Sequence, residues 1–420
     1  MRRLLIGLCV TSVVVYLLMF WPLRDPHPLA RAGGGTFAIP NAKVYISPDL
    51  PPLDGATIVV RNGRIADVGT GVAVPPGVPS LPCDRCVVTA GFWNTHVHFS
   101  EPKFNDAIWG HRASVEADLE DMLTRRGFTT VVDAGSDPRV SVSLRRRIES
   151  GEIRGPHIYL AGRSIYPPAG IPYYVRESVP IWIRWLMPQP ATAGDAAGVV
   201  RQNANAGADL TKLFTGSYVA RGRVLPMPPE VAKAAVDEAH RRGQLVYSHP
   251  SDLSGTKVAI AAGVDILAHA PDSTQGIDDA LLRSIVDHHM AMIPTLKMFA
   301  TTVTDKPAYI QPIHSLVSRF RALGGELLFG TDVGYMEDYR TADEFRALAQ
   351  CGLSSMEILR ALTVAPARRF RVDNEKGTVE AGKLADLTIL DSDPALDANA
   401  FARVLTTIRA GREIFTRASN

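Results

Sequence analysis

Short apolar runs alternate with longer amphipathic segments along most of the chain, from about residue 88 to residue 375. Each run is typical of a strand that is buried on both faces of a parallel sheet. The longer segments place apolar residues three or four positions apart, as amphipathic helices do. In chain order, the strand-like runs are VVTAGFWN, TTVVDAG, HIYLAG, ADLTKLF, QLVYSH, DILAHA, MAMIPTL and ELLFGTD.

Strands that alternate with helices in this way predict an α/β protein built on a closed (β/α)8 barrel of the TIM type. We expect the barrel to span residues 89–375. In such barrels, the side chains that carry chemistry lie at the carboxyl ends of the strands. The third connection, residues 163–190, is rich in proline, tyrosine and tryptophan, and we expect it to form a long loop over the mouth of the barrel.

Shorter strand-like runs, separated by proline, aspartate and glycine, flank this region at both ends of the chain. In VRNGRIADVG, Asn62 and Gly63 supply the positive φ angles of a tight hairpin turn. The same pattern returns after Phe370, in KGTVEAGKLADLTILDSD and RVLTTIRAGREIF. The two ends together predict a small β-sandwich domain that is discontinuous in sequence and consists of residues 37–88 and 376–420.

The first 23 residues have a different composition. From Leu4 to Leu23 the chain carries no charged residue, and about 20 apolar residues suffice for a helix to cross a bilayer. Residues 1–23 therefore predict a transmembrane helix, followed by a linker over residues 24–36. The expected protein is membrane-anchored, with an exported catalytic domain in the periplasm or outside the cell. The alternative is a cleaved signal segment and a secreted enzyme.

The overall composition is that of a globular protein with little bias in charge. It is 46% hydrophobic and 21% charged, with a formal net charge of +2. Because the arginines are scattered and form no basic stripe, we expect no nucleic-acid partner. Assembly into a homo-oligomer is left open.

Four cysteines in 420 residues do not make a disulfide framework. Cys83 and Cys86 form a single CDRC motif, which no second pair completes as a structural zinc site. A local disulfide and two free thiols are both compatible with this motif. We expect Cys351 to pack inside as a helix residue.

Polar residues stand at or near the predicted carboxyl ends of several barrel strands. Alternate residues of a strand share one face, so His96 and His98 can reach the same object. Imidazole and carboxylate suit zinc, and a catalytic site keeps one coordination position open. Taken singly, each histidine is also explained as a core or capping residue. Taken together, the residues predict a metal site at one mouth, made of His96, His98, Lys212, His249, His269 and Asp332.

Lys212 is unusual in this set, because its ammonium group would repel metal ions and is costly to bury. Burial lowers the pKa of an amine, and the neutral amine can add carbon dioxide. The resulting carbamate is an anion with two oxygens that can bridge two cations. The sequence is therefore compatible with one or two Zn²⁺ ions, with carboxylated Lys212 as the bridge in the second case.

Several motifs resemble the metal-dependent amidohydrolase superfamily, in particular its imidazolonepropionase-like and prolidase-like branch. They are GFWNTHVHF, GADLTKLFTG, VYSHP, DILAHA, LLFGTD and GTVEAGKLADLTILDSDP. The resemblance implies that His96, His98 and Asp332 hold the more buried metal. It further implies that Lys212 is the carboxylated bridge, and that His249 and His269 bind the second metal. Two positions depart from the family pattern, Asn94 in place of an aspartate and Pro250 in place of a small residue.

The resemblance implies a metal-dependent hydrolase of C–N bonds in amides, peptides or cyclic amides. A metal-bound hydroxide would attack the carbonyl, with Asp332 as the catalytic proton shuttle. The expected substrate is a small molecule or a dipeptide. Lactone or phosphoester hydrolysis at the same site is an alternative within enzymes, and a non-catalytic, membrane-anchored binding scaffold is an alternative outside them.

Residues of the loops after the third and fourth strands are candidates for the wall of the pocket. An arginine there would suit a substrate carboxylate, although a solvated loop position explains each residue equally well. These residues are Arg163, Tyr166, Tyr173, Tyr174, Tyr218, Arg221 and Arg223.

Overall fold

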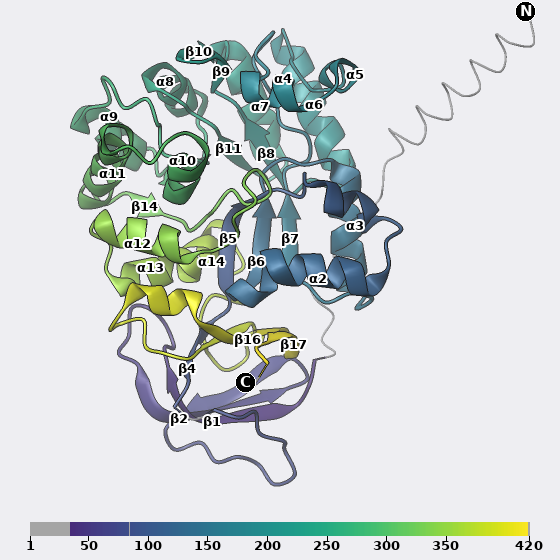
Figure 1. Cartoon of the computed structure of the whole chain (residues 1–420), viewed down its shortest axis with the longest axis vertical. Coiled ribbons are helices and arrows are strands. Elements are labelled where there is room, and N and C mark those ends of the chain that lie inside the picture. Colours follow the sequence, from purple (N-terminus) through teal and green to yellow (C-terminus); the bar gives the residue numbers. More distant parts are fainter. Residues whose placement is uncertain (1–33, 84, 419–420) are drawn as a thin grey trace, which may run out of the picture.

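The computed structural model describes residues 34–83 and 85–418. Within these residues, eight parallel strands surround the centre of the larger, upper part of the molecule (Figure 1). In chain order they are β5 (Phe92–Val97), β6 (Phe128–Asp133), β7 (His157–Leu160), β8 (Leu210–Leu213), β11 (Leu245–Ser248), β12 (Ile266–Leu267), β13 (Ala291–Met292) and β14 (Glu326–Leu327).

These strands close into a barrel. Strands β5 to β7 form one hydrogen-bonded group, and β8 and β11 to β14 form another. The backbone N–H of Ile165 donates to the carbonyl of Lys212 at 2.9 Å and joins the groups on one side. On the other side, the N–H of Thr95 donates to the carbonyl of Phe329 at 2.8 Å. The α/β fold with a TIM-type barrel, predicted from the alternating pattern, is therefore present.

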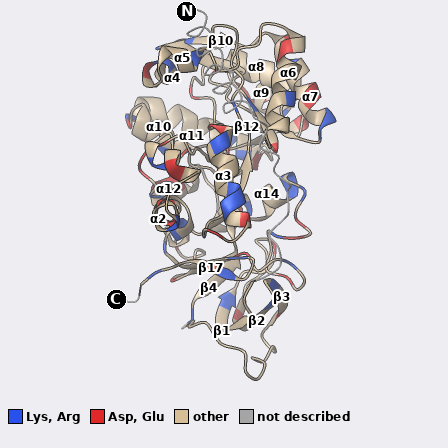
Figure 2. Cartoon of the chain, turned by 90° about the vertical axis from the view of Figure 1, so that its right-hand side faces the viewer, with Lys and Arg blue, Asp and Glu red and all other residues tan. Residues whose placement is uncertain are grey.

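Helices cover the outside of the barrel, with charged residues of both signs interspersed in the view of Figure 2. Among the amphipathic segments, SVEADLEDMLTRRG forms most of α2 and the short helix η2 after it, and PPEVAKAAVDEAHRRG forms α7. The helices around the barrel are η1 (Pro102–Ala107), α2 (Arg112–Met122), η2 (Thr124–Arg126), α3 (Pro138–Glu149), α6 (Ala193–Asn205), α7 (Pro229–Arg241), α8 (Leu253–Ala262), α9 (Asp279–Asp287), α10 (Leu296–Thr302), α11 (Pro307–Ala322), α12 (Ala342–Gln350), α13 (Ser355–Leu362) and α14 (Val364–Arg369).

A second sheet lies below the barrel in Figure 1 and combines both ends of the described chain. Asn62 (φ 50°) and Gly63 (φ 79°) form the predicted hairpin turn between two of its strands. Hydrogen bonds join the strands of this region into one sheet, so the two layers of a sandwich stay a prediction. The domain limits at residues 88 and 376 also stay predictions. In spatial order the strands are β17 (Arg412–Thr416), β16 (Val404–Arg409), β15 (Leu387–Leu390), β4 (Val87–Ala90), β1 (Phe37–Val44), β2 (Leu53–Arg61) and β3 (Arg64–Gly69), and the short helix η3 (Ala398–Ala402) precedes β16.

The first predicted barrel strand, VVTAGFWN, is in fact two strands. Residues before Gly91 form β4 of the lower sheet, and residues after it form β5 of the barrel. A Cβ atom at Gly91 would overlap the side chain of Thr129. The chain therefore crosses from the lower sheet to the barrel at a point where only glycine fits. An apolar run alone does not reveal that its two halves pair with different sheets.

The third connection, predicted as a loop, contains helical segments. These are α4 (Tyr173–Ser178) and α5 (Ile181–Arg184), and Pro172 and Pro180 stand at their N-caps. Proline is well tolerated at the start of a helix, so the prolines that suggested a loop here begin short helices instead. A two-stranded hairpin, β9 (Gly216–Ala220) and β10 (Arg223–Pro226), follows β8.

The cysteines of the CDRC motif form a disulfide, Cys83–Cys86, which decides between the two alternatives left open by the sequence. Cys351 is buried as predicted, and it caps the carboxyl end of α12.

The predicted membrane anchorage is contradicted. Within the described residues, no helix is long and apolar enough to cross a bilayer, and the longest of them, α11, has 16 residues. The segment on which the prediction rested, residues 1–23, lies outside the described residues, as does most of the predicted linker 24–36.

Candidate metal centre

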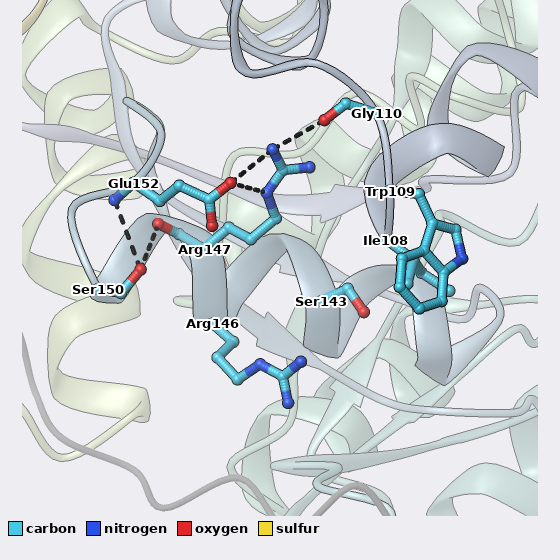
Figure 3. A pocket seen from close by; sticks show the side chains of 8 residues that line it. All are labelled: Ile108, Trp109, Gly110, Ser143, Arg146, Arg147, Ser150 and Glu152. Carbon is cyan, nitrogen blue, oxygen red and sulfur yellow. Dashed lines mark hydrogen bonds and ion pairs between the residues drawn. The ribbon is translucent and has the colours of Figure 1, made fainter.

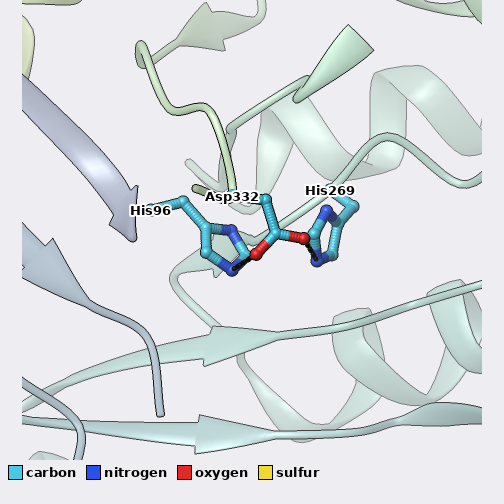
Figure 4. A group of neighbouring side chains, drawn as sticks. All are labelled: His96, His269 and Asp332. Atoms are coloured by element: carbon cyan, nitrogen blue, oxygen red, sulfur yellow. Dashed lines mark ion pairs between the residues drawn. The ribbon is translucent and has the colours of Figure 1, made fainter. Parts of the chain in front are cut away.

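The six residues predicted as metal ligands all stand at or just beyond the carboxyl ends of barrel strands. His96 lies in β5 and Lys212 in β8, and the other four follow β5, β11, β12 and β14. Figure 4 shows His96 and His269 on either side of the Asp332 carboxylate. Strands that are far apart in sequence therefore bring these side chains to one mouth, as the barrel topology predicts.

His96, His98 and Asp332 form the tightest part of the cluster. The Nε2 atoms of the two histidines are 3.3 Å apart. Asp332 Oδ1 lies 3.3 Å from Nε2 of His96 and 3.0 Å from Nε2 of His98. Asp332 itself has a positive φ of 60°, a conformation that is uncommon for a residue with a side chain and is typical of functional sites.

The hydrogen-bond partners of Nδ1 show which ring nitrogen of His96 and of His98 carries the proton. Nδ1 of His96 lies 2.8 Å from the carbonyl of Ala268, and Nδ1 of His98 lies 3.0 Å from the carbonyl of Gly135. Because a carbonyl oxygen only accepts, both Nδ1 atoms carry the hydrogen. In the neutral rings, both Nε2 atoms therefore present lone pairs to the cavity.

The same reasoning applies to His269. Its Nδ1 lies 2.8 Å from Oγ1 of Thr295, and this hydroxyl donates its own hydrogen to the carbonyl of Pro294 at 2.8 Å. The hydroxyl therefore accepts from Nδ1–H of His269. The lone pair on Nε2 is left facing Asp332, whose Oδ2 is 3.9 Å away.

The Nε2 atoms of the three histidines and the oxygens of Asp332 therefore face one another with lone pairs, and no hydrogen atom lies between them. Ligand atoms of His96, His269 and Asp332 lie within 4.8 Å of one another. Among the described residues, no hydrogen-bond donor reaches the buried Oδ1 of Asp332. A buried acceptor without a donor is costly, and a divalent cation between the lone pairs removes that cost. The residues present therefore fit a metal ion.

His249 and Lys212 complete the cluster. The ring of His249 stacks on Phe214 with centroids 4.8 Å apart, and it meets the ring of His269 at 4.5 Å. The Lys212 ammonium lies 5.4 Å from the centre of the Phe214 ring. Within residues 85–418, no carboxylate lies within ion-pair distance of Lys212, although Asp332 and Asp133 are near enough to favour its charge.

Burial dominates the electrostatics of this centre. Desolvation, followed by the positive charge of Lys212, holds the pKa of His96 and of His249 well below the usual value. Desolvation, followed by the neighbouring His249, does the same for the pKa of His269. Burial also lowers the pKa of Lys212 to about 8. His96, His249 and His269 are therefore neutral at physiological pH, which is the form that binds metals.

Two further residues support the ligands, Asp133, which the sequence did not single out, and Asn94, which it marked only as a departure from the family pattern. Asp133, at the end of β6, accepts from Ser136 at 2.6 Å and also from Ser141, and lies 3.9 Å from Nδ1 of His98. Its position at a strand end was an available signal. Asn94 donates to Thr331 at 2.7 Å and ties β5 to the segment that carries Asp332. Asn94, which stands where the family pattern has an aspartate, thus makes this link with an uncharged amide group.

The loop residues that were predicted to line the pocket lie in different environments. Tyr166 is buried against Phe214, whereas Arg221 and Arg223 are exposed. Tyr173 and Tyr174 contact each other, and burial raises the pKa of Tyr174, with a smaller contribution from the charge of Asp332. A separate surface pocket lies outside the barrel between the end of η1 and α3 (Figure 3) and contains none of the six predicted ligands.

Comparison with known proteins defines the class. The sequence pattern of the Amidohydrolase family matches residues 87–414. An uncharacterised protein from Mycobacterium tuberculosis is 30% identical over an alignment of 179 residues that covers 39% of this chain and 47% of that relative. The chain thus matches about half the length of this curated relative.

Solved structures show the same fold. A putative prolidase from Bifidobacterium longum is 26% identical, with a TM-score of 0.74 over 92% of this chain and 95% of that one. An Xaa-Pro dipeptidase with bound methionine is 22% identical, with a TM-score of 0.76 over 91% of this chain and 100% of that one. Molinate hydrolase is 20% identical, with a TM-score of 0.74 over 92% of this chain and 99% of that one.

The family match covers most of the chain, and this chain therefore belongs to the Amidohydrolase family. The resemblance read from the motifs is confirmed, as is the expectation of an enzyme of this family.

Proposed function

We propose that this protein is a metal-dependent hydrolase of amide-type C–N bonds in small molecules. The observation that carries the proposal is the convergence of two imidazole lone pairs and one carboxylate oxygen, with neighbouring atoms 3.0 to 3.3 Å apart. Such a set binds a divalent cation of the zinc type. A bound ion would polarise a carbonyl group and lower the pKa of a coordinated water molecule.

The proposed assignment of ligands follows the family resemblance. His96, His98 and Asp332 would hold one ion, which their mutual distances support. Lys212, His249 and His269 would hold a second, and His269 also faces Asp332 Oδ2. Lys212 suits the bridging role as a carbamate, formed when its neutral amine adds carbon dioxide and releases a proton. Burial without an ion-paired carboxylate favours that neutral amine.

Asp332 is the residue best placed to carry a proton. Its carboxylate lies at the centre of the cluster and is almost fully buried. Oδ2 can accept a proton from the attacking water and deliver it to the nitrogen of the leaving amine. Delivery matters because an amine leaves much more readily once its nitrogen is protonated.

Dipeptides and acylated amino acids are the proposed substrate class. The support is the fold shared with a dipeptidase and a prolidase, together with a mouth lined by tyrosines from α4 and the segment after β14. Tyr174 and Tyr335, whose ring centres are 5.6 Å apart, pack against each other near Asp332 and would line one side of a bound substrate.

The experiment combines metal content with hydrolysis. Protein stripped by a chelator is reloaded with Zn²⁺, and the metal bound per chain is measured by mass spectrometry. A panel of dipeptides and acylated amino acids is then assayed for release of free amine. Metal-dependent cleavage is expected. Loaded protein that cleaves no member of the panel contradicts the proposed function.

Matched histidine variants link the activity to this centre. His98→Ala should lose metal and activity together. His240→Ala is the control, since His240 is exposed on the outer helix α7 and pairs with Asp265 at 2.9 Å. Equal metal content in both variants contradicts the assignment of His98 as a ligand.

A further inference from the structure

Asp272 is a carboxylate held by two tyrosines close to the metal centre. It follows His269 by three residues on the connection after β12. Its Oδ2 accepts hydrogen bonds from the hydroxyl of Tyr218 at 3.1 Å and from the hydroxyl of Tyr309 at 2.8 Å. Tyr218 comes from β9 and Tyr309 from α11, so three separate elements meet at this group.

A continuous aromatic wall connects Asp272 to the metal centre. The ring of His269 contacts that of Phe299 with centroids 6.2 Å apart, and Phe299 contacts Tyr309 at 6.4 Å. The hydroxyl of Tyr309 then reaches Asp272. The carboxylate therefore stands on the same wall as His269, with the rings of Phe299 and Tyr309 between them.

Tyr174 connects this wall to the segment of Asp332, because its ring contacts that of Tyr335 and its helix α4 packs against β9, which carries Tyr218. Burial raises the pKa of Tyr174, and the charges of both Asp332 and Asp272 contribute to the shift. Tyr174 therefore lies near both carboxylates. A substrate whose scissile bond is at Asp332 thus has Asp272 within reach along the tyrosine-lined mouth.

The charge of Asp272 is not compensated by the protein. Among the described residues, no lysine, arginine or histidine nitrogen forms an ion pair with it, and Asp252, a charged group that acts on it, has the same sign. Burial raises the pKa of Asp272, and the two tyrosine hydrogen bonds oppose that rise by stabilising the anion. A half-buried anion beside aromatic rings attracts a cation through both charge and the ring faces.

We propose that Asp272 binds a positively charged group of the substrate, a primary ammonium or a guanidinium. This inference rests on the proposed function and names the substrate class more closely: small amides or peptides that carry a free amino group or a basic side chain. Tyr218 and Tyr309 act as positioning residues that hold the carboxylate toward the cavity. The enzyme is accordingly expected to discriminate against neutral analogues.

The experiment compares substrates that differ in charge. One pair is N-acetyl-lysyl-alanine and N-acetyl-norleucyl-alanine, which differ in side-chain charge. The other is alanyl-alanine and N-acetyl-alanyl-alanine, which differ at the amino terminus. In at least one pair, the metal-loaded wild type should favour the charged member by about tenfold or more in kcat/KM, the effect of one charge-assisted hydrogen bond.

Asp272→Asn keeps the shape of the side chain and removes its charge, so the preference should fall to near parity, mainly through a higher KM for the charged substrate. Asp252→Asn is the matched control, because it removes a nearby negative charge on the N-cap of α8, and asparagine still caps the helix. The control should keep most of the preference. Tyr309→Phe should reduce the preference in part.

Two outcomes overturn the proposal. One is a wild type that cleaves charged and neutral members equally well, and the other is an Asp272→Asn variant that keeps the wild-type preference. If no substrate is cleaved, the proposed function fails, and the binding of L-lysinamide measured by calorimetry still tests the subsite. Weaker binding of this cation to Asp272→Asn supports the subsite, and equal binding overturns it.

Discussion

Glu344 is a fully buried carboxyl group that supports the turn behind His269. It lies in α12 and accepts the backbone N–H groups of Leu296 at 3.0 Å and Lys297 at 2.7 Å, the first two residues of α10. The preceding residue, Thr295, has a positive φ of 49° and accepts the hydrogen bond from His269. Glu344 thus stabilises a strained turn whose hydroxyl sets the tautomer of a proposed ligand.

Burial raises the pKa of Glu344 from 4.5 to about 7. Between these values, the folded protein keeps a proton that the unfolded chain has lost. Stability from this group is therefore present at low pH and is lost as the pH rises toward 7. At about 1.36 kcal/mol per pH unit, the whole effect is worth about 3 kcal/mol, of which about 2.5 kcal/mol falls between pH 5 and pH 8.

Glu344→Gln removes this titration. The free energy of unfolding is measured by urea denaturation at pH 5 and pH 8, in buffer with chelator so that metal binding does not contribute. Relative to the wild type, the variant should gain about 2.5 kcal/mol on going from pH 5 to pH 8. The other titrating groups are common to both proteins and cancel in the difference.

Glu357→Gln is the matched control. Hydrogen bonds from Arg321 and Ser354 outweigh the desolvation of Glu357 and lower its pKa to about 2. Its contribution is present above about pH 4.5 and is lost only as the pH falls further, so the difference between this variant and the wild type should be nearly constant between pH 5 and pH 8. A Glu344→Gln variant that behaves in the same way would refute the protonation of Glu344 in the folded state.

Three further predictions concern the site and the junction between the sheets. Asp332→Asn should lower turnover by about 10²- to 10⁴-fold with an unchanged circular dichroism spectrum, and near wild-type turnover excludes the proton-carrier role. Lys212→Ala should bind less metal per chain, and added acetate should restore part of it; full metal content without acetate argues against a bridge. Gly91→Ala should destabilise the protein by about 1–3 kcal/mol in thermal unfolding, because the new methyl group meets Thr129. Adding Thr129→Ala should recover part of that loss, and no recovery means that the cost has another origin.

Much of the barrel and of the candidate site could be predicted because both depend on local patterns. Apolar runs and amphipathic segments indicate parallel strands and helices, and a closed barrel brings the carboxyl ends of its strands together. His249 and Asp332 were therefore expected at one mouth although 83 positions separate them. Packing at Gly91, in contrast, depends on Thr129, which belongs to another strand, and no local pattern specifies that contact.

Two supporting acids were beyond the reach of the sequence. Glu344 and Asp272 look like ordinary surface acids in an amphipathic helix and a polar loop. Only the folded chain brings Glu344 to the backbone of α10, and only the folded chain gathers tyrosines from β9 and α11 around Asp272. Their pKa values and their roles follow from desolvation and from neighbours that are distant in sequence.

The amino-acid sequence by itself determined the alternation of strands and helices, the family, and the six residues expected to bind metal. Periodicity and strand ends encode these features locally. The tertiary structure decided which ring nitrogen of each histidine faces the cavity, which oxygen of Asp332 is left without a hydrogen-bond donor, and which acids support the site. These features depend on distances of 3 to 4 Å between atoms of different elements, and only the packing of the whole barrel sets such distances.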